Sequence, residues 1–286
     1  MQPLPSPRKH WARLGIADWL CEELARAIPS VVGIDHGFSF PLAYFKKYSL
    51  SLDWPKFLDD FQQHWPTDDP STYVEFVRDG ACGHGDLRRG DKRWLRLTEQ
   101  WTATAKSVFM FDVQGAVAKS THAGLPWLRY LRQHCQRRFH FWPFDGWEVP
   151  QGKSVVAEVY PSLWTRRFPK EDRDGDEQAA FAVSAWLRRA DRSDSLPWFL
   201  APPLTEAERK IADIEGWILG GCDAACGRHE GCRAGAGVSV GAPLQLQRTL
   251  CLRALRPPSV SPDEHRPFPS CATVQTEWTS NDYSAL

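Results

Sequence analysis

The stretch SVVGID at residues 30–35 decides the fold class of this 286-residue chain. It is short and rich in β-branched residues, and Pro29 precedes it, so it predicts a buried strand that ends at the carboxylate of Asp35. The stretch VVAEVY at residues 155–160 has the same character, contains Glu158 and is followed by a proline. An alternating pattern at residues 107–113 predicts a further strand.

Helical patterns surround these strands. Ser6 and Pro7 predict the start of a helix with apolar residues at helical spacing, which Pro29 ends. Similar spacing predicts helices over residues 54–65, 72–78, 125–135, 179–189 and 205–219. Strands that alternate with helices are typical of α/β proteins, so we expect an α/β fold.

The composition changes near residue 220. Thirteen of the 14 tryptophans precede residue 221, whereas five of the eight cysteines follow it. We therefore predict a folded domain over residues 1–220 and a low-order tail rich in Cys, Arg and Pro over residues 221–286, with one helix conceivable at residues 244–255. A native unstructured tail and a non-native extension both account for this change.

Targeting signals and cysteines bear on the compartment. No apolar run reaches the about 18–20 residues of a membrane helix, and the N-terminal residues lack the apolar core of a signal peptide. We therefore predict a cytoplasmic protein that is not bound to a membrane, with Cys21, Cys82 and Cys135 as ordinary thiols. The tail pattern at residues 222–232 has ligands for Zn²⁺, or it leaves exposed thiols that oxidise readily.

Carboxylates gather where the predicted strands end and a helix begins. Asp35 and Glu158 belong to strands, and the acidic residues 172–177 precede the helix predicted at 179–189. Such an oxygen-rich site suits Mg²⁺ or Mn²⁺, which can orient a water and neutralise a phosphodiester. The alternative is that these acids are solvated or cap a helix. His36 either assists a metal-bound water or only makes a hydrogen bond.

Four motifs resemble those of a bacterial domain-of-unknown-function family of predicted nucleases. They are VVGIDHGFSFP at residues 31–41, AEVYP at 157–161, DEQAAFAV at 176–183 and EGWI at 215–218. They occur in the family's order, and the resemblance covers about residues 8–220. It implies an RNase-H-like mixed sheet with flanking helices, and a hydrolase that cleaves the phosphodiester bonds of nucleic acid with Mg²⁺ or Mn²⁺.

The resemblance also assigns the site residues. It implies that Asp35, Glu158 and Asp176 are catalytic and hold the metal. Ala179 stands where the family has an aspartate, so Asp176 or Glu177 would have to replace that ligand from one turn earlier, and we take Asp176. The chain also begins at a helix, which implies that the N-terminal strands of the fold are missing. The alternative to a nuclease is therefore a degenerate, non-catalytic member that acts as a binding or interaction module.

Basic and aromatic residues alternate in two segments, residues 132–142 and 88–96. Such a surface can hold a phosphate backbone while its rings stack on bases, or it is simply a solvated face beside core aromatics. The formal net charge of zero argues against a general polycation, so any affinity for nucleic acid must be local.

Overall fold

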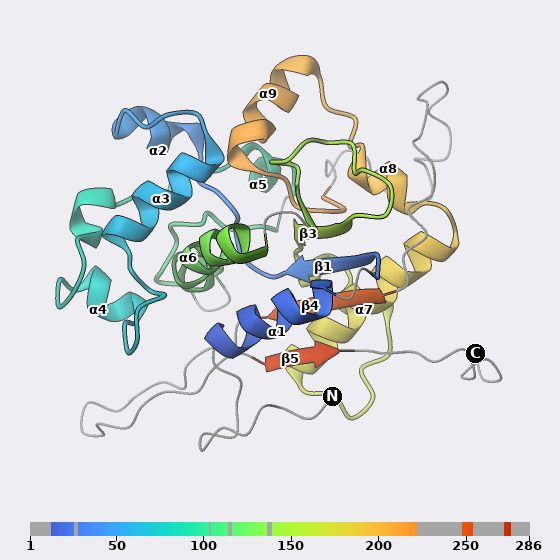
Figure 1. Cartoon of the computed structure of the whole chain (residues 1–286). Helices are drawn as coiled ribbons and strands as arrows, with labels where there is room; N and C mark the ends of the chain where they lie inside the picture. The colour runs from blue at the N-terminus through green and yellow to red at the C-terminus, as the bar shows by residue number, and fades with distance from the viewer. Residues whose placement is uncertain are drawn as a thin grey trace.

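The computed structural model describes residues 13–25, 28–102, 104–113, 116–135, 139–221, 248–253 and 272–275. These residues form a mixed α/β structure with one sheet (Figure 1). The strands run in the order β2-β3-β1-β4-β5: β2 (Phe139–Trp142), β3 (Ser154–Glu158), β1 (Ser30–Ile34), β4 (Arg248–Arg253) and β5 (Ala272–Gln275). The first four are parallel to their neighbours, and β5 pairs with β4 antiparallel.

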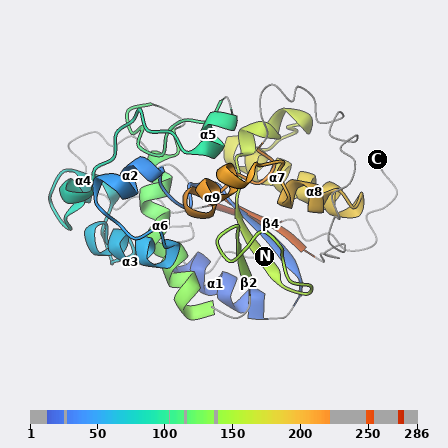
Figure 2. The ribbon, with the colours of Figure 1, turned by 90° about the horizontal axis from the view of Figure 1, so that it is seen from above.

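Helices cover both faces of this sheet. Figure 2 shows α1 and α6 on one side and α7 on the other. The helices are α1 (Arg13–Ala25), α2 (Leu42–Lys47), α3 (Trp54–His64), α4 (Val74–Arg78), α5 (Leu97–Trp101), α6 (Ala118–Cys135), α7 (Gly175–Arg192), α8 (Leu196–Leu200) and α9 (Glu206–Glu215). Short 3₁₀ turns are η1 (Gly85–Arg88), η2 (Pro161–Leu163) and η3 (Thr165–Arg167).

The strand residues alternate between two cores, one on each face of the sheet. Val32 and Val156 belong to the core that α1, α3 and α6 complete, whereas Val31 and Val155 belong to the core that contains α7. Because both faces of the sheet are covered, the strands read as continuous apolar runs rather than as an alternating pattern. This burial explains why the segments at 30–35 and 155–160 stood out in the sequence.

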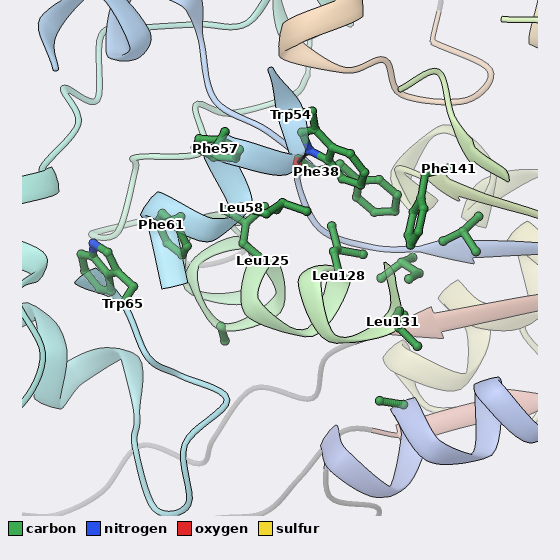
Figure 3. Packing of buried hydrophobic residues seen from close by; sticks show 14 of the residues in the cluster. Phe38, Trp54, Phe57, Leu58, Phe61, Trp65, Leu125, Leu128, Leu131 and Phe141 are labelled. Atoms are coloured by element: carbon green, nitrogen blue, oxygen red, sulfur yellow. Dashed lines mark hydrogen bonds between the residues drawn. The ribbon is translucent and has the colours of Figure 1, made fainter. Parts of the chain in front are cut away.

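Aromatic residues of α3 fill much of the first core. Leu58 of α3 lies beside Leu125 of α6 (Figure 3), while the ring of Phe57 packs on Phe40 and Phe45 with centroid distances of 5.3 and 5.1 Å. Asp53 begins the helix, since its side chain accepts a hydrogen bond from the backbone N–H three residues later. Helices α3 and α6 therefore pack against each other beside the sheet.

Several predictions of secondary structure are confirmed, and two are wrong. The α/β class, the strands at 30–35 and 155–160 and the five helices predicted within residues 54–219 are present, although their bounds shift. Residues 107–113 form turns and bends instead of a strand. In the tail, residues 248–253 form β4 beside β1 rather than a helix. The RNase-H-like fold stays a prediction, and the predicted helix start at residues 6–7 lies outside the described residues.

Strand β4 lies after residue 220, where the composition changes, but it belongs to the same sheet as the strands before that residue. It pairs in parallel with the whole of β1, from Ser30 opposite Arg248 to Ile34 opposite Leu252. Cys251 is buried in the core on the α7 side. Residues 222–247, which include the whole predicted zinc or thiol segment at 222–232, lie outside the described residues.

A disulfide joins α1 to the end of α6. Cys21 and Cys135 are bonded across 114 residues of sequence, with their Cα atoms 5.8 Å apart. The prediction of ordinary thiols is therefore wrong for both, because their proximity depends on helix packing that sequence spacing does not reveal. Disulfides persist in oxidising compartments, so this bond does not favour the cytoplasmic location, which stays a prediction.

We expect the double substitution Cys21→Ala and Cys135→Ala to lower the free energy of unfolding by about 2–4 kcal/mol, because the bond restricts a long loop in the unfolded chain. Urea unfolding followed by circular dichroism measures this loss. A reductant should lower the stability of the wild type toward that of the variant. Cys82→Ala, which removes a free and half-buried thiol, is the control. Equal stability of the double variant and the wild type would contradict the prediction.

Candidate functional site

The carboxyl ends of β1 and β3 bring two of the predicted site residues to one edge of the sheet. Ile34 lies directly opposite Glu158 in the parallel register, so Asp35 follows at the next position. Glu158 is 4% exposed, whereas Asp35 is half-buried. In parallel sheets this edge is where ligands commonly bind. The structure therefore brings Asp35 and Glu158 together at the edge where a functional site is expected.

Arg96 occupies both oxygens of the Glu158 carboxylate. Its Nη2 lies 2.6 Å from Oε1, and its Nη1 lies 2.7 Å from Oε2. The backbone N–H of Phe38, in the loop after β1, also donates to Oε2 at 3.1 Å. Such a two-point pair with a planar guanidinium is among the strongest side-chain contacts in proteins. Glu158 is thus paired within the fold.

The same guanidinium holds a second carboxylate. Arg96 precedes α5 and donates from Nε to Glu99 Oε1 at 2.9 Å, while its backbone N–H donates to Glu99 Oε2 at 3.0 Å. Burial lowers the pKa of Arg96, but the charges of Glu158 and Glu99 outweigh this effect and raise it. Burial raises the pKa of Glu99, and Arg96 opposes that shift.

Glu215 adds a third carboxylate to this group from the end of α9. It accepts hydrogen bonds from the backbone N–H of Leu42 in α2 at 2.7 Å and of Leu97 in α5 at 2.5 Å. Its carbonyl oxygen accepts from Arg96 Nη1 at 3.3 Å. Burial raises the pKa of Glu215. We call Arg96, Glu99, Glu158 and Glu215 the Arg96 cluster, which ties β3 to α2, α5 and α9.

His36 lies beside the Arg96 cluster as a buried, neutral group. Its Nδ1 is 2.9 Å from the carbonyl oxygen of Gly37. Burial lowers the pKa of His36 to about 4, and the Gly37 contact only partly opposes this. Gly124 of α6 packs directly on the ring, since a Cβ there would lie 2.3 Å from Nε2. This site favours the hydrogen-bonding alternative for His36 over assistance to a metal-bound water.

The third predicted ligand lies in the first turn of α7. Asp176 donates its backbone N–H to Asp174 Oδ1, and Asp174 also caps the helix through the N–H of Glu177. Ala179, one turn further on, is completely buried. The Glu177 side chain in turn accepts from the Asp174 backbone N–H at 2.9 Å, so Asp174 and Glu177 cap α7, which is the helix-capping alternative that the sequence left open.

The residues at this edge do not fit a bound Mg²⁺ or Mn²⁺. Within the described parts of the chain, no three His, Cys, Asp or Glu side chains are grouped so that they could hold a metal ion. Both oxygens of Glu158 are engaged by Arg96 instead. Mg²⁺ requires a nearly octahedral set of oxygen ligands, which a carboxylate paired with arginine does not provide.

The two segments in which basic and aromatic residues alternate, 132–142 and 88–96, lie in different surroundings. The first contributes Arg132, Phe139, His140 and Phe141 to a hollow of about 390 Å³ at strand β2, completed by Asp145, Pro150 and Lys153. Arg132 pairs with Asp145 there at 2.8 Å, so part of its charge is neutralised. Arg137 and Arg138 lie outside the described residues. In the second segment, Arg96 is buried in its cluster, and the remaining cations lie on the surface.

Sequence reasoning missed most of the Arg96 cluster. It placed Arg96 on a basic surface because other arginines surround it, and it gave no role to Glu99. Glu215 carried a signal, since an acid in the last turn of a helix opposes the helix dipole and needs a local reason. That reason is the pair of backbone N–H groups that Glu215 accepts from.

The fold and the site define a mixed α/β protein with an arginine–carboxylate cluster at the carboxyl edge of its sheet. Comparisons with protein-family models, curated proteins and solved structures give no match to this chain. Among the described residues, no helix combines the length and the apolar character needed to cross a membrane.

Proposed function

We propose that this protein is a non-catalytic binding module rather than a metal-dependent nuclease. The observation that carries the proposal is the two-point contact of Arg96 with Glu158, at 2.6 and 2.7 Å. The Arg96 guanidinium is bound to the carboxylate that, in the nuclease hypothesis, should bind the metal ion. The substitution of the expected aspartate by Ala179 points the same way.

The alternative, a nuclease that uses Asp35, Glu158 and Asp176, requires the Arg96 contact to open. Opening would leave Arg96 and Glu158 apart in a site from which water is almost excluded, since Arg96 is 1% exposed. Breaking a buried ion pair costs about 3–5 kcal/mol, which a weakly held divalent ion does not readily supply. The cluster is therefore better explained as a structural core at the edge of the sheet.

A metal titration tests this proposal. We expect 1 mM Mn²⁺, about the concentration at which a site of millimolar affinity is half filled, to leave the melting temperature of the wild type unchanged. We also expect no cleavage of labelled single-stranded or duplex DNA or RNA with Mn²⁺ or Mg²⁺. A rise in melting temperature that Asp35→Asn abolishes, or a metal-dependent cleavage that Glu158→Gln abolishes, would overturn the proposal in favour of the nuclease. Asp194→Asn, in an exposed loop, is the matched control.

A further inference from the structure

Positive charges gather where the end of α2 meets residues 86–93, a loop that contains most of η1 and the residues after it. Lys47 is the last residue of α2, and the loop carries Arg88, Arg89, Lys92 and Arg93. We call these five cations, with the half-buried rings of Tyr48 and Trp94, the basic patch. Its loop contains only two carboxylates, Asp86 and Asp91, so a local excess of positive charge exists in a chain whose net charge is zero.

Three cations of the basic patch make no ion pair with the described residues. Arg88 pairs with Asp60 at 2.7 Å and Arg93 with Asp91 at 2.6 Å, so these two are partly neutralised. The other three are exposed, and no carboxylate of the described residues lies within ion-pair distance of them: Lys47, Arg89 and Lys92.

Aromatic rings lie directly among these charges. The ring of Tyr48 has Lys47 Nζ 4.9 Å and the Arg88 guanidinium 5.0 Å from its centroid. Lys47 Nζ is also 5.6 Å from the centroid of Trp94. Rings interleaved with cations are the arrangement that lets a surface hold phosphates and stack on bases at once.

The backbone of the loop is fixed in place. Lys47 Nζ and the Tyr48 hydroxyl both donate to the carbonyl oxygen of Arg89, at 3.1 and 2.7 Å. Gly90 lies flat on the ring of Phe109, where a Cβ would come within 2.2 Å of a ring carbon. Because the loop is held before any ligand arrives, little conformational entropy would be lost on binding.

We propose that the basic patch binds single-stranded nucleic acid, with Lys47, Arg89 and Lys92 on phosphates and Tyr48 and Trp94 beside bases. This inference rests on the proposed function, since it names the partner of a binding module. A single strand fits better than a duplex because its bases are free to stack on rings. The rival partner is an anionic membrane surface, since Leu87 in the same region is 54% exposed.

Fluorescence anisotropy with a labelled oligothymidylate of about 20 nucleotides tests the inference, a length that covers one or two ordinary single-strand sites. We expect binding by the wild type that weakens about 20-fold between about 50 and 200 mM salt, as three phosphate contacts predict. The triple variant Lys47→Gln, Arg89→Gln and Lys92→Gln should bind at least about tenfold more weakly and show a flatter salt dependence. Tyr48→Leu should weaken binding about tenfold.

A control variant that loses the same number of positive charges elsewhere distinguishes the effect of the basic patch from the effect of the protein's net charge. Lys170→Gln, Arg189→Gln and Lys210→Gln remove three exposed cations from other segments and should change affinity less than about twofold. Circular dichroism and urea unfolding of each variant establish that it is folded. An equal loss in both triple variants would overturn the inference, as would the absence of binding by the wild type.

Two further results would show which of the two proposals fails. Binding to vesicles that contain phosphatidylserine, lost in the patch variant while oligonucleotide binding is absent, would replace nucleic acid by a membrane surface and overturn the inference. Metal-dependent cleavage of a bound oligonucleotide would instead overturn the proposed non-catalytic function, while loss of binding in the patch variant would still support the basic patch. The failures of the two proposals are therefore distinguishable.

Discussion

Replacing Arg96 with methionine should lower the free energy of unfolding by about 3–5 kcal/mol, because it removes the only cation of a buried cluster that holds three carboxylates. Glu99 and Glu158 would lose their ion pairs while remaining shielded from water. Urea unfolding at pH 7 measures the loss. We expect the difference in unfolding free energy between the wild type and the variant to shrink as the pH falls toward 5, since protonation removes the unpaired buried charges.

Arg93→Met is the matched control for this prediction. It lies three residues earlier and pairs with Asp91 at 2.6 Å, but its side chain is 84% exposed. Water screens such a pair, so its loss should change the free energy of unfolding far less than the loss of Arg96 does. Equal effects of Arg93→Met and Arg96→Met would contradict the role of burial.

A second substitution tests whether the cost arises from unpaired charge. Glu158→Gln in the Arg96→Met background removes one buried carboxylate and keeps its shape and its acceptor for the Phe38 N–H. We expect this double variant to be more stable than Arg96→Met alone, although Glu158→Gln by itself destabilises the wild type. A simple sum of the two losses would show that the residues do not interact, contrary to their contact at 2.6 Å.

The sequence predicts those parts of the fold that depend on local pattern. The β-branched segment at 30–35 and the amphipathic helix at 54–65 each contain their own signal, so their class could be predicted without a partner. Strand β2 could not, because its sequence FHFW follows arginines and resembles a solvated aromatic surface. Strand β4 depends on its pairing with β1, far away in sequence, and its short apolar run fits a helix equally well.

The candidate site shows the same division. The sheet edge that joins Asp35 and Glu158 follows from the parallel arrangement of their strands, and the sequence anticipates it. The partner of Glu158 does not follow, because Arg96 lies 62 residues away and looks locally like its exposed neighbours. Residue type suggests a charge, whereas only packing decides whether that charge meets solvent, a metal or another side chain.

Acidification from pH 7 to pH 5 should destabilise the protein because two histidines are buried in neutral form. Burial lowers the pKa of His36 to about 4 and of His122 to about 3, although each ring has its Nδ1 2.9 Å from a backbone carbonyl oxygen, a contact that opposes the shift. Below pH 6.5 these histidines are protonated in the unfolded chain but stay neutral in the folded chain. The free energy of unfolding therefore decreases as the pH is lowered. Each pKa unit corresponds to about 1.4 kcal/mol, which gives about 2 kcal/mol per histidine at pH 5.

His122 offers the sharper test because its ring is completely buried among aromatic side chains. It lies in α6 with Trp65, Phe111 and Phe40 at centroid distances of 4.6, 4.7 and 5.2 Å. His122→Leu removes the titration and keeps an apolar side chain in that space. We expect the difference in unfolding free energy between pH 7 and pH 5 to shrink by about 2 kcal/mol, whatever the variant's stability at pH 7.

Gln133→Leu provides the control, since Gln133 is exposed on the same helix and does not titrate. This variant should leave the difference in unfolding free energy between pH 7 and pH 5 unchanged. Glu99 and Glu215 act in the opposite sense, because their raised pKa values make the folded protein take up protons before the unfolded chain does. The change in unfolding free energy of the wild type between pH 7 and pH 5 should therefore be smaller than the histidines alone would give. Because Glu99 and Glu215 are present in both proteins, their contribution cancels when His122→Leu is compared with the wild type. An unchanged slope in His122→Leu would show that the ring already accepts a proton in the folded state.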